Sequence, residues 1–133
     1  MATTIQYAST PRIGAATLTT GDTSRTAPTT VATVLTGGSS GTRVDQIDAV
    51  GLATTVSSGL RLFLHDGTTY TLLREFPVQP VTASAGTVWE LHVNTNTDPA
   101  VFPIILPNAS WSLRMTVNDT QTGIRVTARG GDF

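Results

Sequence analysis

The sequence contains no cysteine, no lysine and no long apolar run. The absence of cysteine excludes a disulfide framework, a thiolate nucleophile and a cysteine-ligated zinc site. No apolar run approaches the roughly 20 residues that a membrane-spanning helix needs, so we expect no membrane partner. The first residues also lack the basic region and apolar core of a signal peptide. We therefore expect a soluble protein that is made in a cytoplasm.

Charge is scarce as well, because only 13% of the residues are Asp, Glu, Lys or Arg and the formal net charge is −1. All eight positive charges are arginines, and they are spread along the chain. Binding to nucleic acid through its phosphates needs clustered positive charge. The sequence therefore predicts no nucleic-acid partner.

Threonine is the abundant polar residue, with 26 copies among 133 residues. Its branched side chain loses freedom in a helix and suits the pleated surface of a sheet. Polar faces built from threonine carry little charge, and charged residues are depleted in the centres of protein interfaces. This composition favours β-structure and is compatible with an adhesive surface.

The clearest local pattern is a β-hairpin over residues 60–78. Apolar and other side chains alternate from Leu60 to His65, which is the period of two of a strand. Asp66-Gly67 follows, a pair that tolerates the backbone of a tight turn, and a second strand returns from Tyr70 to Phe76. We expect this hairpin to fix the strand register of the domain.

Similar patterns predict more short strands and no helix of ten residues. Residues 43–52 have a spacing between those of a strand and a helix, which predicts a strand with a bulge. The other predicted strands are 31–35, 87–93, 111–117 and 124–128, with 101–106 as an edge strand or an extended loop. Seven or eight short strands are typical of an all-β antiparallel β-sandwich, and their spacing suits a jelly roll.

The first 30 residues differ in composition from the rest and leave two interpretations open. They are rich in Thr, Ala, Ser and Gly, and their few apolar residues are scattered. Either they form a terminal segment with a short strand near residues 15–20, or they form an extended arm that lies along a neighbouring subunit. We therefore divide the chain into an N-terminal arm or strand (1–30) and a single β-sandwich domain (31–133).

No combination of residues predicts catalysis or a cofactor. His65 and His92 each have a carboxylate nearby, Asp66 and Glu90, but no short two-histidine metal motif is present. A Gly-x-Ser-x-Gly nucleophile turn is also absent, and most aspartates lie in turn-like contexts. We expect no catalytic residue, no metal and no cofactor, and a protein that is not an enzyme.

Two weaker patterns have alternative interpretations. Asn108 and Asn118 begin glycosylation acceptor patterns, which carry little weight without a secretion signal. Trp89 and Trp111 could form a platform on which a sugar stacks, but each lies on an alternating strand beside Leu or Val, which favours packing in the core.

Three stretches carry a resemblance to a known family. They are Thr42-Arg-Val-Asp-Gln-Ile, then Gly59-Leu-Arg-Leu-Phe-Leu-His-Asp-Gly-Thr-Thr-Tyr, and Leu73-Arg-Glu-Phe-Pro-Val. With the ending Ala128-Arg-Gly-Gly-Asp-Phe133, the chain resembles small head decoration (cement) proteins of tailed bacteriophages. The resemblance covers roughly residues 40–80 and the C-terminal end.

The resemblance implies a jelly-roll-like sandwich without enzymatic activity. It further implies a virion location on the outer surface of an HK97-type capsid, after synthesis in the cytoplasm of a bacterial host. The implied partners are the major capsid protein, whose neighbouring subunits it would clamp, and the protein itself, as a homodimer or a homotrimer. The alternatives are a tail or baseplate component and a receptor- or carbohydrate-binding module.

Scattered apolar residues near the N-terminus are the residues from which we predict contact with the capsid. The segment that carries them is too rich in Thr and Pro to fold alone. These predicted contact residues are Ile5, Tyr7, Pro11 and Ile13.

Overall fold

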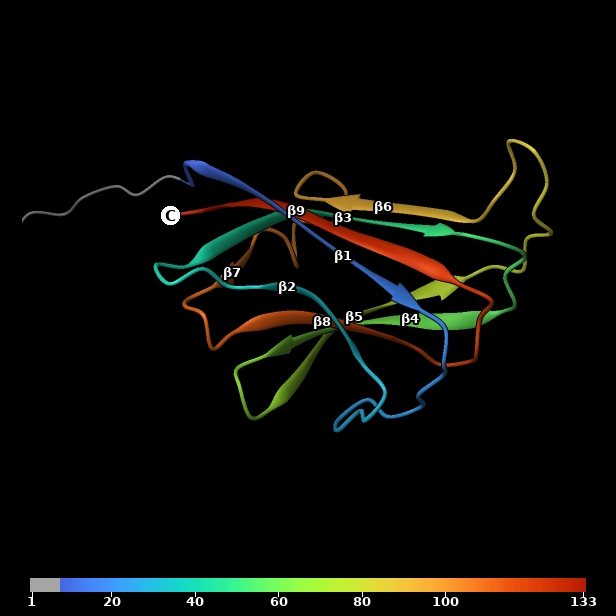
Figure 1. The fold of residues 1–133 in the computed structure, drawn as a ribbon, viewed down its shortest axis with the longest axis horizontal. Helices are drawn as coiled ribbons and strands as arrows, with labels where there is room; N and C mark the ends of the chain where they lie inside the picture. Colours follow the sequence, from blue (N-terminus) through green and yellow to red (C-terminus); the bar gives the residue numbers. More distant parts are fainter. Residues whose placement is uncertain (1–7) are drawn as a thin grey trace, which may run out of the picture.

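The computed structural model describes residues 8–133, which form two antiparallel β-sheets packed face to face (Figure 1). No helix occurs in these residues, so none could cross a membrane. The strands of residues 8–133 are β1 (Thr10–Leu18), β2 (Ala32–Thr36), β3 (Thr42–Gly51), β4 (Ser58–His65), β5 (Tyr70–Val78), β6 (Glu90–Asn94), β7 (Ile104–Leu106), β8 (Ser112–Val117) and β9 (Ile124–Asp132).

The strand order identifies the sandwich as a jelly roll. The first sheet has the order β1-β9-β3-β6, with β7 paired to β3 beyond the end of β6, and the second sheet has the order β2-β8-β4-β5. The pairs β1–β9, β2–β8, β3–β6 and β4–β5 are nested, as in one long hairpin that has been rolled into two sheets. The predicted fold class is confirmed.

The β4–β5 hairpin is the apex of this rolled hairpin, and it forms where the alternation predicts it. The Asp66 carboxylate accepts hydrogen bonds from the backbone N–H groups of Thr68 and Thr69, at 2.9 and 2.7 Å. Gly67 has a φ of +102°, a backbone conformation that residues with a Cβ rarely adopt. The Asp66-Gly67 turn therefore joins the innermost strand pair, and the other nested pairs lie outside it in sequence.

The core lies between the sheets and rests on aliphatic side chains from both. It includes Ile47 and Val126 from the first sheet and Leu60, Leu62 and Met115 from the second, all fully buried. Trp89 is also buried in this core, and Trp111 packs against its margin. The prediction that both tryptophans pack with the core is confirmed.

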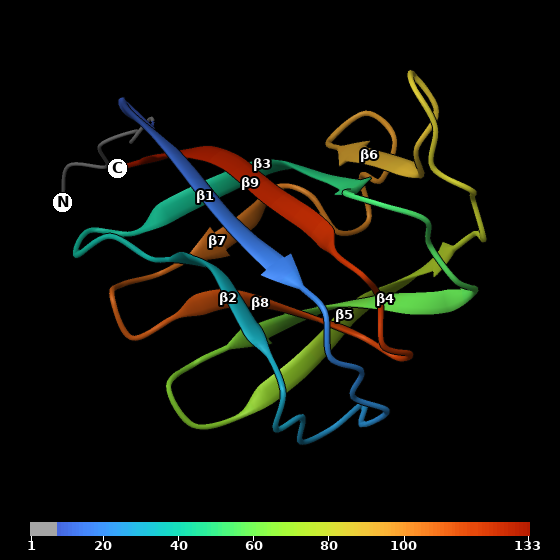
Figure 2. The same ribbon diagram turned by 45° about the vertical axis from the view of Figure 1, so that its right-hand side comes forward.

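A segment over residues 19–31, here called the strap, connects β1 to β2 and packs against the second sheet (Figure 2). The Asp22 carboxylate organises it by accepting hydrogen bonds from the backbone N–H groups of Ser24, Thr29 and Thr30. These bonds hold the pKa of Asp22 below its usual value. The strap covers part of the second sheet's outer face, which alternation alone would leave open to solvent.

Several strand boundaries differ from the predicted ones. The N-terminal strand begins at Thr10 instead of near residue 15, β6 is shorter than the predicted strand 87–93, and β9 continues to Asp132 instead of ending at Ala128. The predicted bulge in β3 is present, because the pairing with β9 skips Asp45. Beyond Ala128 the chain is therefore part of the sheet instead of a tail.

Candidate interaction surface

The outer face of the first sheet gathers several of the predicted residues with others that the sequence did not single out. Strand pairing places the outward side chains in rows across β1, β9, β3 and β6. One row is Ile13, Arg129, Gln46 and Asn94; the next is Ala15, Thr127, Asp48 and His92; the third is Thr17, Arg125, Val50 and Glu90. Here the name "outer face" means these rows together with Pro11.

Two of the four predicted contact residues lie at one corner of the outer face. Pro11 and Ile13 project outward from β1, which is an edge strand, and Ile13 is 65% exposed. Beside Pro11, β9 has Gly131, and Ala8 packs over this glycine: a Cβ at Gly131 would lie 3.0 Å from Ala8 Cβ. Ile5 and Tyr7 lie outside the described residues. The exposed apolar side chain of Ile13 at this corner suits contact with another protein surface.

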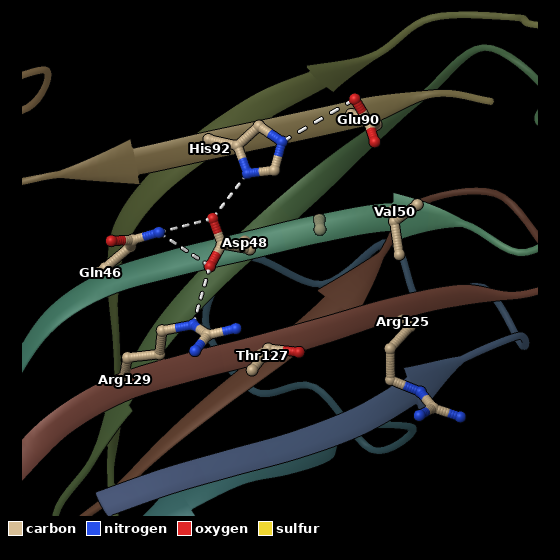
Figure 3. A pocket seen from close by; sticks show the side chains of 9 residues that line it. Gln46, Asp48, Val50, Glu90, His92, Arg125, Thr127 and Arg129 are labelled. Atoms are coloured by element: carbon tan, nitrogen blue, oxygen red, sulfur yellow. Dashed lines mark hydrogen bonds and ion pairs between the residues drawn. The ribbon is translucent and has the colours of Figure 1, made fainter. Parts of the chain in front are cut away.

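The middle of the outer face holds a polar cluster around Asp48. Its carboxylate is 2.6 Å from His92 Nδ1, 2.9 Å from Gln46 Nε2 and 3.4 Å from Arg129 Nε (Figure 3). Burial raises the pKa of Asp48, but the hydrogen bonds from His92 and Gln46 outweigh it, and the pKa lies below its usual value. Asp48 is thus held ionised, and it fixes the side chains of three strands on one surface.

A hollow of about 600 Å³ opens beside this cluster. Its lining includes the shorter side chains of Val50 and Thr127 and longer ones, among them Glu90 and Arg125 (Figure 3). Both signs of charge therefore border one shallow depression. Such a depression can accept a long polar side chain from another molecule.

The two histidines do not come together. His92 lies on the outer face of the first sheet, and His65 is buried on β4 of the second sheet. Among residues 8–133, no group of three or more His, Cys, Asp or Glu side chains is placed to hold a metal ion. His92 is instead paired with Asp48, while Glu90 Oε2 stays 3.9 Å from its Nε2.

A second polar cluster, under the strap, is built around an arginine that the sequence analysis did not single out. Arg61 is 1% exposed; its Nη1 donates to the Asp22 carbonyl at 2.9 Å and its Nη2 to Asn118 Oδ1 at 2.7 Å. Its Nε lies 3.1 Å from Glu75 Oε1, as an ion pair without hydrogen-bond geometry. Arg25 on the strap binds the other side of Glu75. This cluster joins four parts of the chain and is structural.

Local sequence signals could not have found these clusters. Asp48, His92 and Arg129 come from three strands, and only the strand register brings them together. Arg61 alternates with Leu60 and Leu62, and this pattern predicts a side chain that faces solvent. The covering strap is what buries it.

Comparisons with known proteins were made at the level of sequence and of structure. No family model and no curated protein matches the chain. It is similar to a chain of the cyanophage Pam1 capsid asymmetric unit, with 15% identity over 100% of this chain and 92% of that one and a TM-score of 0.46.

Two structures of infectious bursal disease virus are also similar. The Gx strain structure has 12% identity over 98% of this chain and a TM-score of 0.36, and the VP2 subviral particle has 11% identity over 99% and a TM-score of 0.34. This chain spans 35% of each of those two chains. At these identities and TM-scores the likenesses assign no family and no function.

Proposed function

We propose that this protein is a structural virion protein that binds the outside of an HK97-type phage capsid and holds neighbouring major capsid protein subunits together. The sequence resemblance of residues 40–80 and of the C-terminal end to phage cement proteins supports this proposal. The jelly-roll topology is compatible with it. In this proposal the protein is a binding module without catalytic activity.

The observation that carries the proposal is the exposed apolar corner on β1. Ile13 leaves about two thirds of its surface in water although β1 is paired along its whole length. Burying such a side chain against a partner contributes up to roughly 1.5–3 kcal/mol. We place the capsid contact at Pro11 and Ile13, and we propose that the preceding segment with Ile5 and Tyr7 extends it along the neighbouring subunit.

A small contact of this kind is sufficient for a cement protein. A molecule that binds only the assembled shell stabilises the shell by mass action. Many copies on a symmetric lattice multiply a modest affinity per site, since each copy bridges subunits that are already held together. The low net charge of −1 is compatible with dense packing on a surface.

The test is binding of the purified protein to capsids that lack it, measured by co-sedimentation. Ile13→Thr removes the apolar corner, and we expect about tenfold weaker binding, which corresponds to about 1.4 kcal/mol. Leu52→Thr is the matched control, because Leu52 is 54% exposed but follows the far end of β3. Equal binding of the Ile13→Thr variant and the unmodified protein would overturn the proposed contact.

Cryo-electron microscopy of the virion tests the location independently. The proposal requires density for this chain on the outer surface of the shell. Density on the tail would assign the protein to a tail or baseplate component instead. A sugar-stacking platform on Trp89 and Trp111 has no support, because the side chain of Trp89 is buried.

A further inference from the structure

Among residues 8–133, no carboxylate pairs with Arg125 on the outer face and no arginine pairs with Glu90. Arg125 donates from Nε to Thr17 Oγ1 at 2.9 Å, and no carboxylate of the described chain pairs with it. The Glu90 side chain is 58% exposed, and its Oε2 lies 3.9 Å from His92 Nε2, beyond hydrogen-bond distance. Both groups border the hollow described above.

Their positions are symmetrical about Val50. Arg125 pairs with Val50 from β9, and Glu90 pairs with Val50 from β6, so the three residues form one row (Figure 3). Two strand spacings separate Arg125 from Glu90, which is about 10 Å between their backbones. Figure 3 draws no interaction between their side chains, and Val50 occupies the space between them.

We propose that a second copy of this chain packs on the outer face, with Arg125 of each copy paired to Glu90 of the other. A two-fold axis that lies in the interface and runs along β3 over Val50 exchanges the two sides of the row. In such an interface, residue i contacts residue j and residue j contacts residue i. The charges on this face are therefore complementary to the same charges on a second copy. This complementarity is the reason for proposing a second copy as the partner.

The shape of the face agrees with this arrangement. Sheets pack face to face about 10 Å apart, a gap that one arginine and one glutamate side chain together can bridge. The hollow of about 600 Å³, lined by Val50, Thr127 and Glu90, leaves room for the partner's Arg125 beside Glu90. Asp48 also lies near the axis and faces its own copy, but its carboxylate already pairs with Arg129 and hydrogen-bonds to His92 within the same copy.

The area predicts a weak dimer. Three strands over about six residues give a patch of roughly 14 by 20 Å, or about 300 Å² in projection for each copy. Stable interfaces bury about 800 Å² per partner. We therefore expect association only at high concentration, such as the millimolar effective concentration on a particle surface. The patch leaves the Pro11–Ile13 corner outside it, so this inference is separate from the proposed capsid contact.

Charge exchange tests the proposal on the full chain without a capsid. We expect the unmodified protein to form dimers near 1 mM at low ionic strength in sedimentation equilibrium, and to dissociate as salt is added. Glu90→Arg and Arg125→Glu should each weaken the dimer more than about tenfold, because like charges then face each other twice. Both side chains are exposed, and circular dichroism will check that each variant is folded.

Two combinations should restore association. An equimolar mixture of the two single variants should form a heterodimer of unmodified affinity, since every contact is again between opposite charges. The double variant should form a homodimer for the same reason. A protein that stays monomeric near 1 mM, that forms a trimer, or whose association ignores these exchanges would overturn the proposal.

Discussion

His65 is a buried histidine that the fold keeps neutral. Its Nδ1 accepts a hydrogen bond from the backbone N–H of Gly67 at 3.2 Å, and its ring lies 4.3 Å from the ring of Tyr70. Burial lowers the pKa of His65, and the positive charge of Arg114 lowers it further. Protonation would place a hydrogen on the atom that accepts from Gly67. The hairpin turn thus depends on the uncharged ring.

This environment makes stability depend on pH. Because the folded pKa lies below the ordinary 6.5, the unfolded chain binds the proton first as pH falls. The stability from neutral His65 is complete above pH 6.5 and is lost as pH falls towards the folded pKa. His65→Asn keeps an acceptor near Nδ1 and does not titrate, so the loss between about pH 7.5 and 5.5 should be smaller. Urea unfolding followed by tryptophan fluorescence measures this; an equal loss in both proteins would contradict it.

At the scale of elements, one buried side chain, Arg61, links the strap to two other parts of the sandwich. Arg61 reaches the strap through the Asp22 carbonyl, β5 through Glu75 and the β8–β9 turn through Asn118. Hydrogen bonds from Arg25 lower the pKa of Glu75, and the charge of Arg61 lowers it further, so the carboxylate stays ionised. The strap is therefore an integral part of the sandwich.

Arg61→Met tests this role. The change fills the same space but leaves the Asp22 carbonyl and Asn118 without their donor, and Glu75 with Arg25 alone. Removing one partner of a buried pair costs 3–5 kcal/mol, and since Glu75 is one third exposed we expect about 2–3 kcal/mol. Arg43→Met is the control: Arg43 forms an exposed ion pair with Asp45, and its loss should cost under about 1 kcal/mol. Denaturant midpoints compare the two; equal shifts would refute the role of Arg61.

At the scale of the whole molecule, alternation and turn chemistry predicted most of the fold. The hairpin around Asp66-Gly67, the bulge of β3 and the sandwich class all follow from local pattern. The predicted bounds were wrong for two strands of the first sheet, because β1 begins earlier and β9 ends later than the pattern indicates. Gly14 in β1 approaches β2 so closely that a Cβ there would lie 2.1 Å from the Val34 carbonyl oxygen, and Ile13 on the opposite face of β1 is exposed. That close approach is a property of the packed sheets, and the pattern of residues does not reveal it.

The candidate surface was less accessible to prediction. Pro11 and Ile13 were identified from their apolar character alone, whereas the pairing of Asp48 with His92 depends on the register of β3 and β6. Arg125 and Glu90 are 35 residues apart in sequence and share a row only because β3 lies between their strands. A site built across a rolled hairpin has no spacing signature, since its residues come from both arms of the chain.

The C-terminal end is where the structure differs most from the prediction made from the sequence. The residue pattern predicts that the last strand ends at Ala128, but Gly130 and Gly131 also belong to β9, between β1 and β3. A Cβ at Gly130 would lie 1.8 Å from the Arg43 carbonyl oxygen, so glycine is required by close approach. Asp132 accepts hydrogen bonds from Thr42 and Arg12, which hold its pKa below the usual value.

Deleting residues 130–133 should therefore destabilise the whole domain. The deletion removes the end of a central strand, with its pairing to two neighbours, and we expect the melting temperature to fall by about 10 °C or more, as a loss of roughly 3 kcal/mol would cause. Asp132→Asn is the matched control, because it weakens the ion pair with Arg12 but keeps the strand, and it should give only a small part of that fall. Thermal unfolding followed by circular dichroism measures both. An unchanged melting temperature after the deletion would mean that residues 130–133 do not stabilise the sheet.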